Sequence, residues 1–292
     1  MTEEAHSLHS KAVAEVAPPA VDYLPPMPKS REHPIALIGA GGISSAHLDA
    51  YRKAGFNVRV IASRHLEHAN ARRDEFFPKA EITTDIEGTI ARPDIEVVDL
   101  TPHPEVRAPL IEAAINAGKH VLSQKPFVLD LGLGERLADL AAKRGVMLAV
   151  NQNGRWAPHL SFMREAVRQG LVGKVQSVHI AIAWDHSWVA GTHFEEIEDL
   201  ILYDFAIHWF DFLATLIGPT ATSVRATRAR APGQKPKPPL LAEALVEFPN
   251  GQGALLFDGA TKFGPRDRTI ITGTEGMLES IGPDLGQQQV TF

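Results

Sequence analysis

The chain has 292 residues, of which 44% are hydrophobic and 22% are charged, a composition typical of one large or two ordinary folded domains. Its net charge of −6 at pH 7 supplies no basic field for phosphate backbones, so we expect no nucleic-acid partner. Cysteine is absent, which excludes disulfides and thiolate metal sites. Redox chemistry would therefore depend on a cofactor.

The first segment, residues 1–32, predicts an extended, proline-rich arm because it contains the run APPAVDYLPPMP. It is either a loose tail or an arm that packs on a neighbouring subunit through Val21, Tyr23 and Leu24. Its start is acidic where a signal peptide is basic, and no stretch approaches the roughly 20 apolar residues of a membrane span. We expect a cytoplasmic protein that does not contact a membrane.

Residues 33–150 alternate short β-rich runs with longer helical patterns, which predicts βαβ units and a doubly wound parallel sheet of the Rossmann type. Gly55, Gly118 and Gly145 each follow a helical run, where a left-handed residue commonly ends a helix. The strand-like runs lie at residues 35–39, 57–62, 96–100, 120–123 and 146–150.

Residues 151–292 have a different pattern, with two helical stretches and several longer strand-like runs at hairpin spacing. This predicts an α+β domain with an open, mainly antiparallel sheet. A bare sheet face is costly, so we expect a homodimer or homotetramer formed through it. The helical stretches are residues 159–169 and 200–218, and the strand-like runs are residues 175–184, 221–230, 242–248, 251–259 and 268–274.

The run IALIGAGGISSAH places a glycine-rich turn between the first strand and the first helix, as a dinucleotide-binding fingerprint requires. Gly39 would form the tight turn, and Gly41 would let the backbone approach a pyrophosphate at the helix N-terminus. Ser44 replaces the usual third glycine or alanine but is also small. The predicted cofactor contacts here are Gly39, Gly41, Gly42 and Ile43.

The second strand ends in Ser63 and Arg64, where NAD-binding proteins usually carry an acidic residue for the ribose 2′-hydroxyl. A hydroxyl and a guanidinium suit a 2′-phosphate instead, so we expect NADP rather than NAD. Arg64 could alternatively be a solvated residue at a helix start. Further along, Thr101, Pro102 and His103 follow a strand and are expected to border the nicotinamide.

Four motifs occur in a family-specific order: GAGGISSAH, VVDLTPHPEVRAPLIEAAINAGKHVLSQKPF, NQNGRW and DFAIHWFD. Together they resemble the Gfo/Idh/MocA oxidoreductases, which include sugar and inositol dehydrogenases, over about residues 34–280. The resemblance implies a Rossmann domain followed by an open-sheet substrate domain.

In that family a Glu-Lys-Pro motif follows one Rossmann strand, and this chain has Gln124, Lys125 and Pro126 there. The resemblance implies that Lys125 and its neighbour Gln124 contact the cofactor and that Lys125 also contacts the substrate. Proline disfavours helical geometry at the residue before it, so Lys125 is held extended at the ligand-binding edge of the sheet. Its ammonium could polarise a substrate oxygen.

The family's second motif, Asp-x-Gly-x-His-x-x-Asp, is matched by Asp204, His208 and Asp211, with Ala206 in the glycine position. On an α-helix this spacing puts the three side chains on one face, and a nearby carboxylate could orient the histidine ring. The expected catalytic residues are Lys125, Asp204 and His208. His208 takes the hydroxyl proton, Lys125 stabilises the alkoxide and Asp204 positions the substrate.

Further substrate contacts are expected where loops follow the strands of both domains. These residues could equally be packing or subunit contacts. No metal is expected, because Asp204 and His208 alone are too few ligands. The expected substrate-binding residues are Asn151, Arg155, Trp156, Trp184, Asp204 and His208.

The resulting hypothesis is an NAD(P)-dependent dehydrogenase or reductase that acts on a secondary alcohol or carbonyl of a sugar, cyclitol or related polyol. One alternative within this class returns the hydride from a bound nicotinamide to the same or a second sugar. The other alternative is a non-catalytic NADP-binding sensor or assembly protein, which Gln124 would favour.

Overall fold

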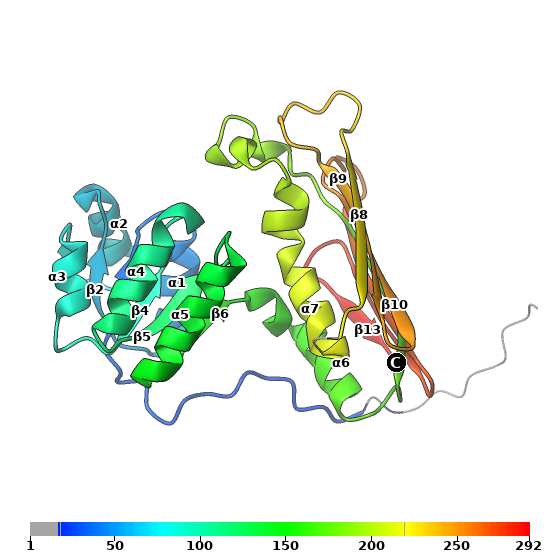
Figure 1. Ribbon diagram of the computed structural model, residues 1–292, viewed down its shortest axis with the longest axis horizontal. Helices are drawn as coiled ribbons and strands as arrows, with labels where there is room; N and C mark the ends of the chain where they lie inside the picture. Colours follow the sequence, from blue (N-terminus) through cyan, green and yellow to red (C-terminus); the bar gives the residue numbers. More distant parts are fainter. Residues whose placement is uncertain (1–16, 18, 219) are drawn as a thin grey trace, which may run out of the picture.

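The computed structural model describes residues 17, 19–218 and 220–292; the predicted arm before residue 17 and at residue 18 lies outside them. Two sheets, each with its own helices, form two halves that are joined after β6 by a short connection (Figure 1). Among the described residues, no helix has both the length and the apolar character needed to cross a bilayer.

The first sheet is parallel and has six strands in the order β3-β2-β1-β4-β5-β6. The order reverses between β1 and β4, which creates the crevice where such sheets bind ligands. Its strands are β1 (Ile35–Ile38), β2 (Val58–Ala62), β3 (Glu81–Thr83), β4 (Val97–Leu100), β5 (His120–Gln124) and β6 (Leu148–Asn151). Its helices are α1 (Ser44–Ala54), α2 (Leu66–Phe76), α3 (Ile86–Ala91), α4 (Pro104–Asn116) and α5 (Leu131–Arg144).

Helices cover both faces of this sheet, because the central strands are apolar on both sides. One buried cluster packs α1 and α2 against the sheet, around Leu48 and Ala69. The other packs α4 and α5 against the opposite face, around Ile111 and Leu137. Gly55 ends α1 and Gly145 ends α5 in the left-handed conformation, with φ of 74° and 67°, as predicted.

The second sheet has seven strands in the order β13-β12-β11-β7-β10-β9-β8, and only the β7–β10 pair is parallel. The helices α6 (Pro158–Arg168) and α7 (Ile207–Ile217) cover one face of this sheet (Figure 1). The core between these helices and the sheet includes Phe212 of α7 and Val178 of β7. The strands are β7 (Val175–Ala183), β8 (Ser223–Ala229), β9 (Leu241–Phe248), β10 (Gly251–Asp258), β11 (Arg266–Gly273), β12 (Met277–Gly282) and β13 (Gln289–Thr291). Both parts of the predicted fold class are confirmed.

The described part of the arm packs on its own chain. Val21 contacts the core of the second half, the Tyr23 ring meets Phe162 edge to face, and the Ser161 hydroxyl donates to the Tyr23 carbonyl at 2.6 Å. Leu24, in contrast, is 70% exposed. Two of the three expected anchors therefore pack on the second half of the same chain, where the sequence had left a loose tail or a neighbouring subunit as alternatives.

Candidate functional site

The glycine-rich loop between β1 and α1 has both a tight turn and an open surface. Gly39 has φ +97°, and a Cβ there would lie 2.9 Å from Thr101 Oγ1 and 3.0 Å from Pro102 Cδ, so only glycine fits. The Thr101 hydroxyl donates to the Gly39 carbonyl at 2.6 Å. At Gly41 and Gly42 a Cβ would meet nothing within 4 Å. This bare backbone at a helix N-terminus fits a dinucleotide pyrophosphate.

A cation that the sequence analysis missed lies beside this loop. Arg72 from α2 donates through Nε to Ser44 Oγ at 3.2 Å and through a terminal nitrogen to the Gly41 carbonyl at 3.4 Å. Ile43, the loop residue before α1, is 46% exposed. Nothing in the local sequence distinguishes Arg72 from the other charged residues of α2.

The two residues expected to select the cofactor differ in accessibility. Ser63 is 6% exposed, and its hydroxyl accepts the His65 backbone N–H at 3.4 Å. Arg64 is exposed at the end of the sheet. The guanidinium of Arg64 is therefore the more available of the two groups.

Lys125 connects the two halves of the molecule. It follows β5, and its Nζ donates to the Asp204 carbonyl oxygen at 2.8 Å and to Asp204 Oδ2 at 3.1 Å. Asp204 is 7% exposed and belongs to a π-helical turn, Ile201–Phe205, that precedes α7. The Phe205 ring lies 5.8 Å from Nζ. A residue of the first half is thus paired with one from the second half.

His208 lies one turn further, in α7, and packs closely on the loop after β6. A Cβ on Gly154 would come within 2.9 Å of the His208 Cβ and 3.2 Å of its Nδ1, so glycine makes room for the ring. Burial, and then the positive charge of Lys125, lowers the pKa of His208 to about 4. The imidazole is therefore neutral at pH 7 and can accept a proton.

The expectation that a carboxylate of the same helix orients this ring is wrong. Asp204 pairs with Lys125, and Asp211 accepts both Arg155 hydrogen bonds, one of them 2.7 Å from Nε to Oδ2. Within the described residues, His208 Nδ1 has no hydrogen-bond partner. Its orientation comes from packing.

The other expected substrate-binding residues lie in three different parts of the structure. Asn151 points into the Rossmann half, where its amide lies 3.0 Å from His47 Nε2. Trp184 packs edge to face on Trp209 in the second half. Arg155 and Trp156 line a cavity of about 420 Å³ between the halves. The other residues that line this cavity are Phe127, Val150, Gln152, Ile207 and Asp211.

A second contact between the halves involves His103, expected beside the nicotinamide. Its ring centroid lies 3.9 Å from that of His193, in a short helical turn of the second half. Burial, and then the neighbouring His193, lowers the pKa of His103. The loop after β4 therefore contacts the second half through His103.

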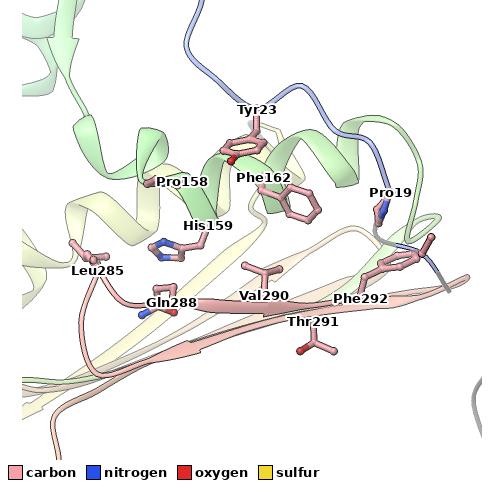
Figure 2. Close-up of a pocket in the computed structure, with 12 residues that line it drawn as sticks. Pro19, Tyr23, Pro158, His159, Phe162, Leu285, Gln288, Val290, Thr291 and Phe292 are labelled. Atoms are coloured by element: carbon pink, nitrogen blue, oxygen red, sulfur yellow. The ribbon is translucent and has the colours of Figure 1, made fainter. Parts of the chain in front are cut away.

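A cavity of about 570 Å³ lies away from these groups (Figure 2). It is formed by the arm, α6 and β13, with Tyr23, His159 and Phe292 among its lining residues. Neither Lys125 nor His208 lines it, so we do not place the candidate active site there. Among the described residues, no group of three or more histidine or acidic side chains could hold a metal ion.

The fold and the glycine-rich loop define a two-domain protein whose first half is a Rossmann dinucleotide-binding domain. Residues 34–152 match the model of the oxidoreductase family with an NAD-binding Rossmann fold, and residues 161–279 match the GFO/IDH/MocA C-terminal domain. The chain belongs to the Gfo/Idh/MocA family.

Individual relatives agree with this assignment. An oxidoreductase of Schizosaccharomyces pombe that is named uncharacterized is 27% identical over 80% of this chain and 66% of its own length. An inositol 2-dehydrogenase of Rhizobium meliloti is 30% identical over 66% of this chain and 57% of its own length. The chain thus spans about two thirds or less of the curated relatives that it matches.

Among solved structures, an oxidoreductase from Agrobacterium radiobacter in complex with NAD⁺, L-tartaric acid and magnesium has the same fold. Its TM-score is 0.79 at 21% identity, and the match covers 89% of this chain and 79% of that one.

Proposed function

We propose that this protein is an NAD(P)-dependent oxidoreductase that oxidises a secondary alcohol, or reduces the corresponding carbonyl, of a sugar, cyclitol or related polyol. The observation that carries the proposal is the pairing of Lys125 with Asp204 across the two halves, next to His208. The Lys125 ammonium, at the edge of the first sheet, thus lies near a neutral base and a carboxylate that both come from the second half. The inositol 2-dehydrogenase relative supports the substrate class.

In this proposal the open backbone at Gly41 and Gly42 holds the pyrophosphate, with Arg72 beside it. The bound nicotinamide supplies the hydride acceptor or donor. His208 takes the proton of the substrate hydroxyl, because its ring is neutral at pH 7. The Lys125 ammonium stabilises the developing alkoxide.

We also propose NADP as the preferred cofactor. Arg64 is exposed at the end of β2, and a guanidinium can hold a phosphate through two parallel hydrogen bonds. No acidic residue occupies the end of this strand to accept a ribose 2′-hydroxyl.

We further propose that two or more copies associate through the outer face of the second sheet. The helices α6 and α7 cover the inner face (Figure 1), whereas Leu245 and Leu256 on the outer face are 54% and 44% exposed. Apolar side chains on a bare sheet face favour burial between copies.

The catalytic proposal is tested with His208→Asn and with His33→Asn, a matched control at an exposed position before β1. Both variants are assayed with NADP⁺ and NAD⁺ against a panel of inositols and aldoses by absorbance at 340 nm. Loss of the base should lower kcat about 10²- to 10⁴-fold, while the control keeps wild-type turnover. Wild-type turnover by His208→Asn would remove this histidine from the mechanism.

A further inference from the structure

Gln124, the residue before Lys125, has only one orientation of its side-chain amide that fits its neighbours. Its Oε1 accepts the Lys125 backbone N–H at 2.6 Å, so Nε2 is the atom that faces His47 Nε2 at 3.2 Å. In the flipped orientation, the Gln124 amide N–H would face the Lys125 backbone N–H, and neither could accept a hydrogen bond. Residue 124 is therefore a donor toward His47 and an acceptor toward Lys125.

This orientation determines the tautomer of His47. Because Gln124 donates to Nε2, that nitrogen carries a lone pair, and the Asn151 amide 3.0 Å away donates to it as well. The ring proton is then on Nδ1, which donates to Asp99 Oδ2 at 2.7 Å. Neutral imidazole carries one donor and one acceptor nitrogen, so both nitrogens are satisfied without a positive charge.

The group is closed off from water, so leaving any of its polar atoms without a hydrogen bond would be costly. Asp99 is fully buried, Gln124 is 6% exposed and His47 is 7% exposed. Tyr51 donates to the same Asp99 oxygen at 2.9 Å, and burial followed by Asp99 raises the pKa of this tyrosine. Two titratable groups lie near the His47 ring: Asp99 of β4, which contacts it, and Tyr51 of α1, which contacts Asp99. The neighbours from β5 and β6 are the side-chain amides of Gln124 and Asn151.

The carbonyl side of the same segment is held separately. Arg107 in α4 is 1% exposed and donates to the carbonyl oxygens of Lys125, at 3.4 Å, and of Pro126. The backbone of Lys125 is thus held through its N–H by Gln124 and through its carbonyl by Arg107, which leaves only the side chain to reach Asp204.

We propose that His47 is a neutral positioning residue, and that Asp99, His47 and Gln124 form a chain of hydrogen bonds that holds Lys125 at the site. The family motif carries glutamate at position 124. A carboxylate there would face the His47 lone pair unless the ring took up a proton. With glutamine at this position the His47 ring is neutral, whereas with glutamate the ring carries a positive charge. The group formed by Asp99, His47 and residue 124 therefore has a net charge of −1 in both cases. The role of Lys125 in this inference rests on the proposed function, whereas the protonation of His47 does not.

The test is ¹⁵N NMR of histidine-labelled protein at pH 7, which requires no turnover. Three proteins are compared: wild type, Gln124→Glu, and Gln169→Glu as a matched control at an exposed position after α6. In the wild type and the control, we expect the His47 Nε2 signal at the shift of an unprotonated nitrogen. In Gln124→Glu, both nitrogens of the His47 ring should show the shift of protonated imidazolium.

A wild-type His47 that is protonated on Nε2, or a Gln124→Glu ring that stays neutral, would overturn the inference. If Gln124→Glu does not fold, the wild-type spectrum still tests the inference, because the Gln124 amide fixes an unprotonated Nε2 in His47. Absence of turnover in the wild type would overturn the proposed function and leave this measurement unaffected.

Discussion

At the scale of single residues, Lys125 makes one of the contacts between the two halves. Its ammonium already donates to two oxygens of Asp204, so a substrate oxygen would share or replace these contacts. Both partners are largely shielded from water, which strengthens a charge-assisted hydrogen bond relative to an exposed one. Under the proposed function, the same two residues would hold the two halves together and bind a polar substrate.

Cofactor preference is tested at Arg64. Replacing it by glutamine removes one charge-assisted contact to a 2′-phosphate, so NADPH affinity should fall roughly ten- to a hundredfold while NADH affinity changes little. Arg59→Gln, on the strand β2 that precedes Arg64 and paired with Asp94, is the control. Fluorescence titration gives both constants. Equal losses for NADPH and NADH, or no loss, would contradict the proposed 2′-phosphate site.

The motif residues of the candidate site could be proposed from the sequence, but the residues behind them could not. Gly39 and Lys125 could be found because their spacing is local and the neighbouring residues restrict the backbone. His47 and Asp99 lie 52 positions apart and meet only because β1 and β4 are adjacent in the sheet. Arg107 looks like an ordinary helix cation until the fold buries it. Contacts of this kind depend on strand order, which periodicity does not reveal.

At the scale of secondary-structure elements, the segment before α7 shows why the expected arrangement of carboxylates failed. Asp204 lies in a π-helical turn, and such a turn holds more residues than an α-turn. The α-helical spacing that would stack Asp204 over His208 therefore does not apply. Asp204 reaches the other half of the molecule instead, where Lys125 binds it.

A buried acid in β11 predicts how the stability of the second sheet depends on pH. Burial, and then Asp284, raises the pKa of Asp267 to about 7, and both of its carboxyl oxygens lack a partner among the described residues. The folded state keeps a proton that the unfolded state releases near pH 3.9. This contribution to stability is therefore full below about pH 3.9 and is lost as the pH rises through 7.

Asp267→Asn should remove this dependence and raise the free energy of unfolding at pH 8 by up to about 4 kcal/mol, since each pKa unit corresponds to about 1.4 kcal/mol. Urea unfolding at pH 5 and pH 8 measures the change. Asp139→Asn, at an exposed position of α5, should leave both values unchanged. A lower stability of Asp267→Asn at pH 8 would show that the carboxylate is needed in the folded protein.

At the scale of the whole molecule, strand register aligns the exposed side chains of the second sheet. Leu245 of β9 lies opposite Ala254 of β10, which lies beside His179 of β7 and, across it, Ile270 of β11. This row runs across the face that α6 and α7 leave uncovered (Figure 1). It is where we expect copies to meet.

Leu245→Glu should therefore convert an oligomer to a monomer, because a charge buried between copies is costly. Sedimentation velocity of wild type and variant measures this. Leu129→Glu, which is 64% exposed beside the Rossmann half, should remain oligomeric. A wild type that is monomeric at all concentrations, or a Leu245→Glu variant of unchanged size, would rule out this face.

The general architecture could be predicted because hydrophobic periodicity is a local property of the sequence. The alternation of strands and helices identified a parallel sheet, and the later hairpin-spaced runs identified the second sheet. The short β3 and α3 were not distinguished, since elements of this length have little periodicity. The contact of the arm with the second half of its own chain was also not foreseen, because it depends on two tertiary contacts, at Val21 and Tyr23.

The central claim, that the glycine-rich loop binds a dinucleotide, is tested most directly by titrating NADPH and NADH into wild type and Gly41→Val. A Cβ at Gly41 meets nothing within 4 Å, and its φ is not in the left-handed region, so the variant should fold with an unchanged melting temperature. We predict binding by the wild type and a loss of about a hundredfold or more in the variant, because the side chain occupies the space that the pyrophosphate needs. No binding by the wild type, or equal affinity in both proteins, would contradict the claim.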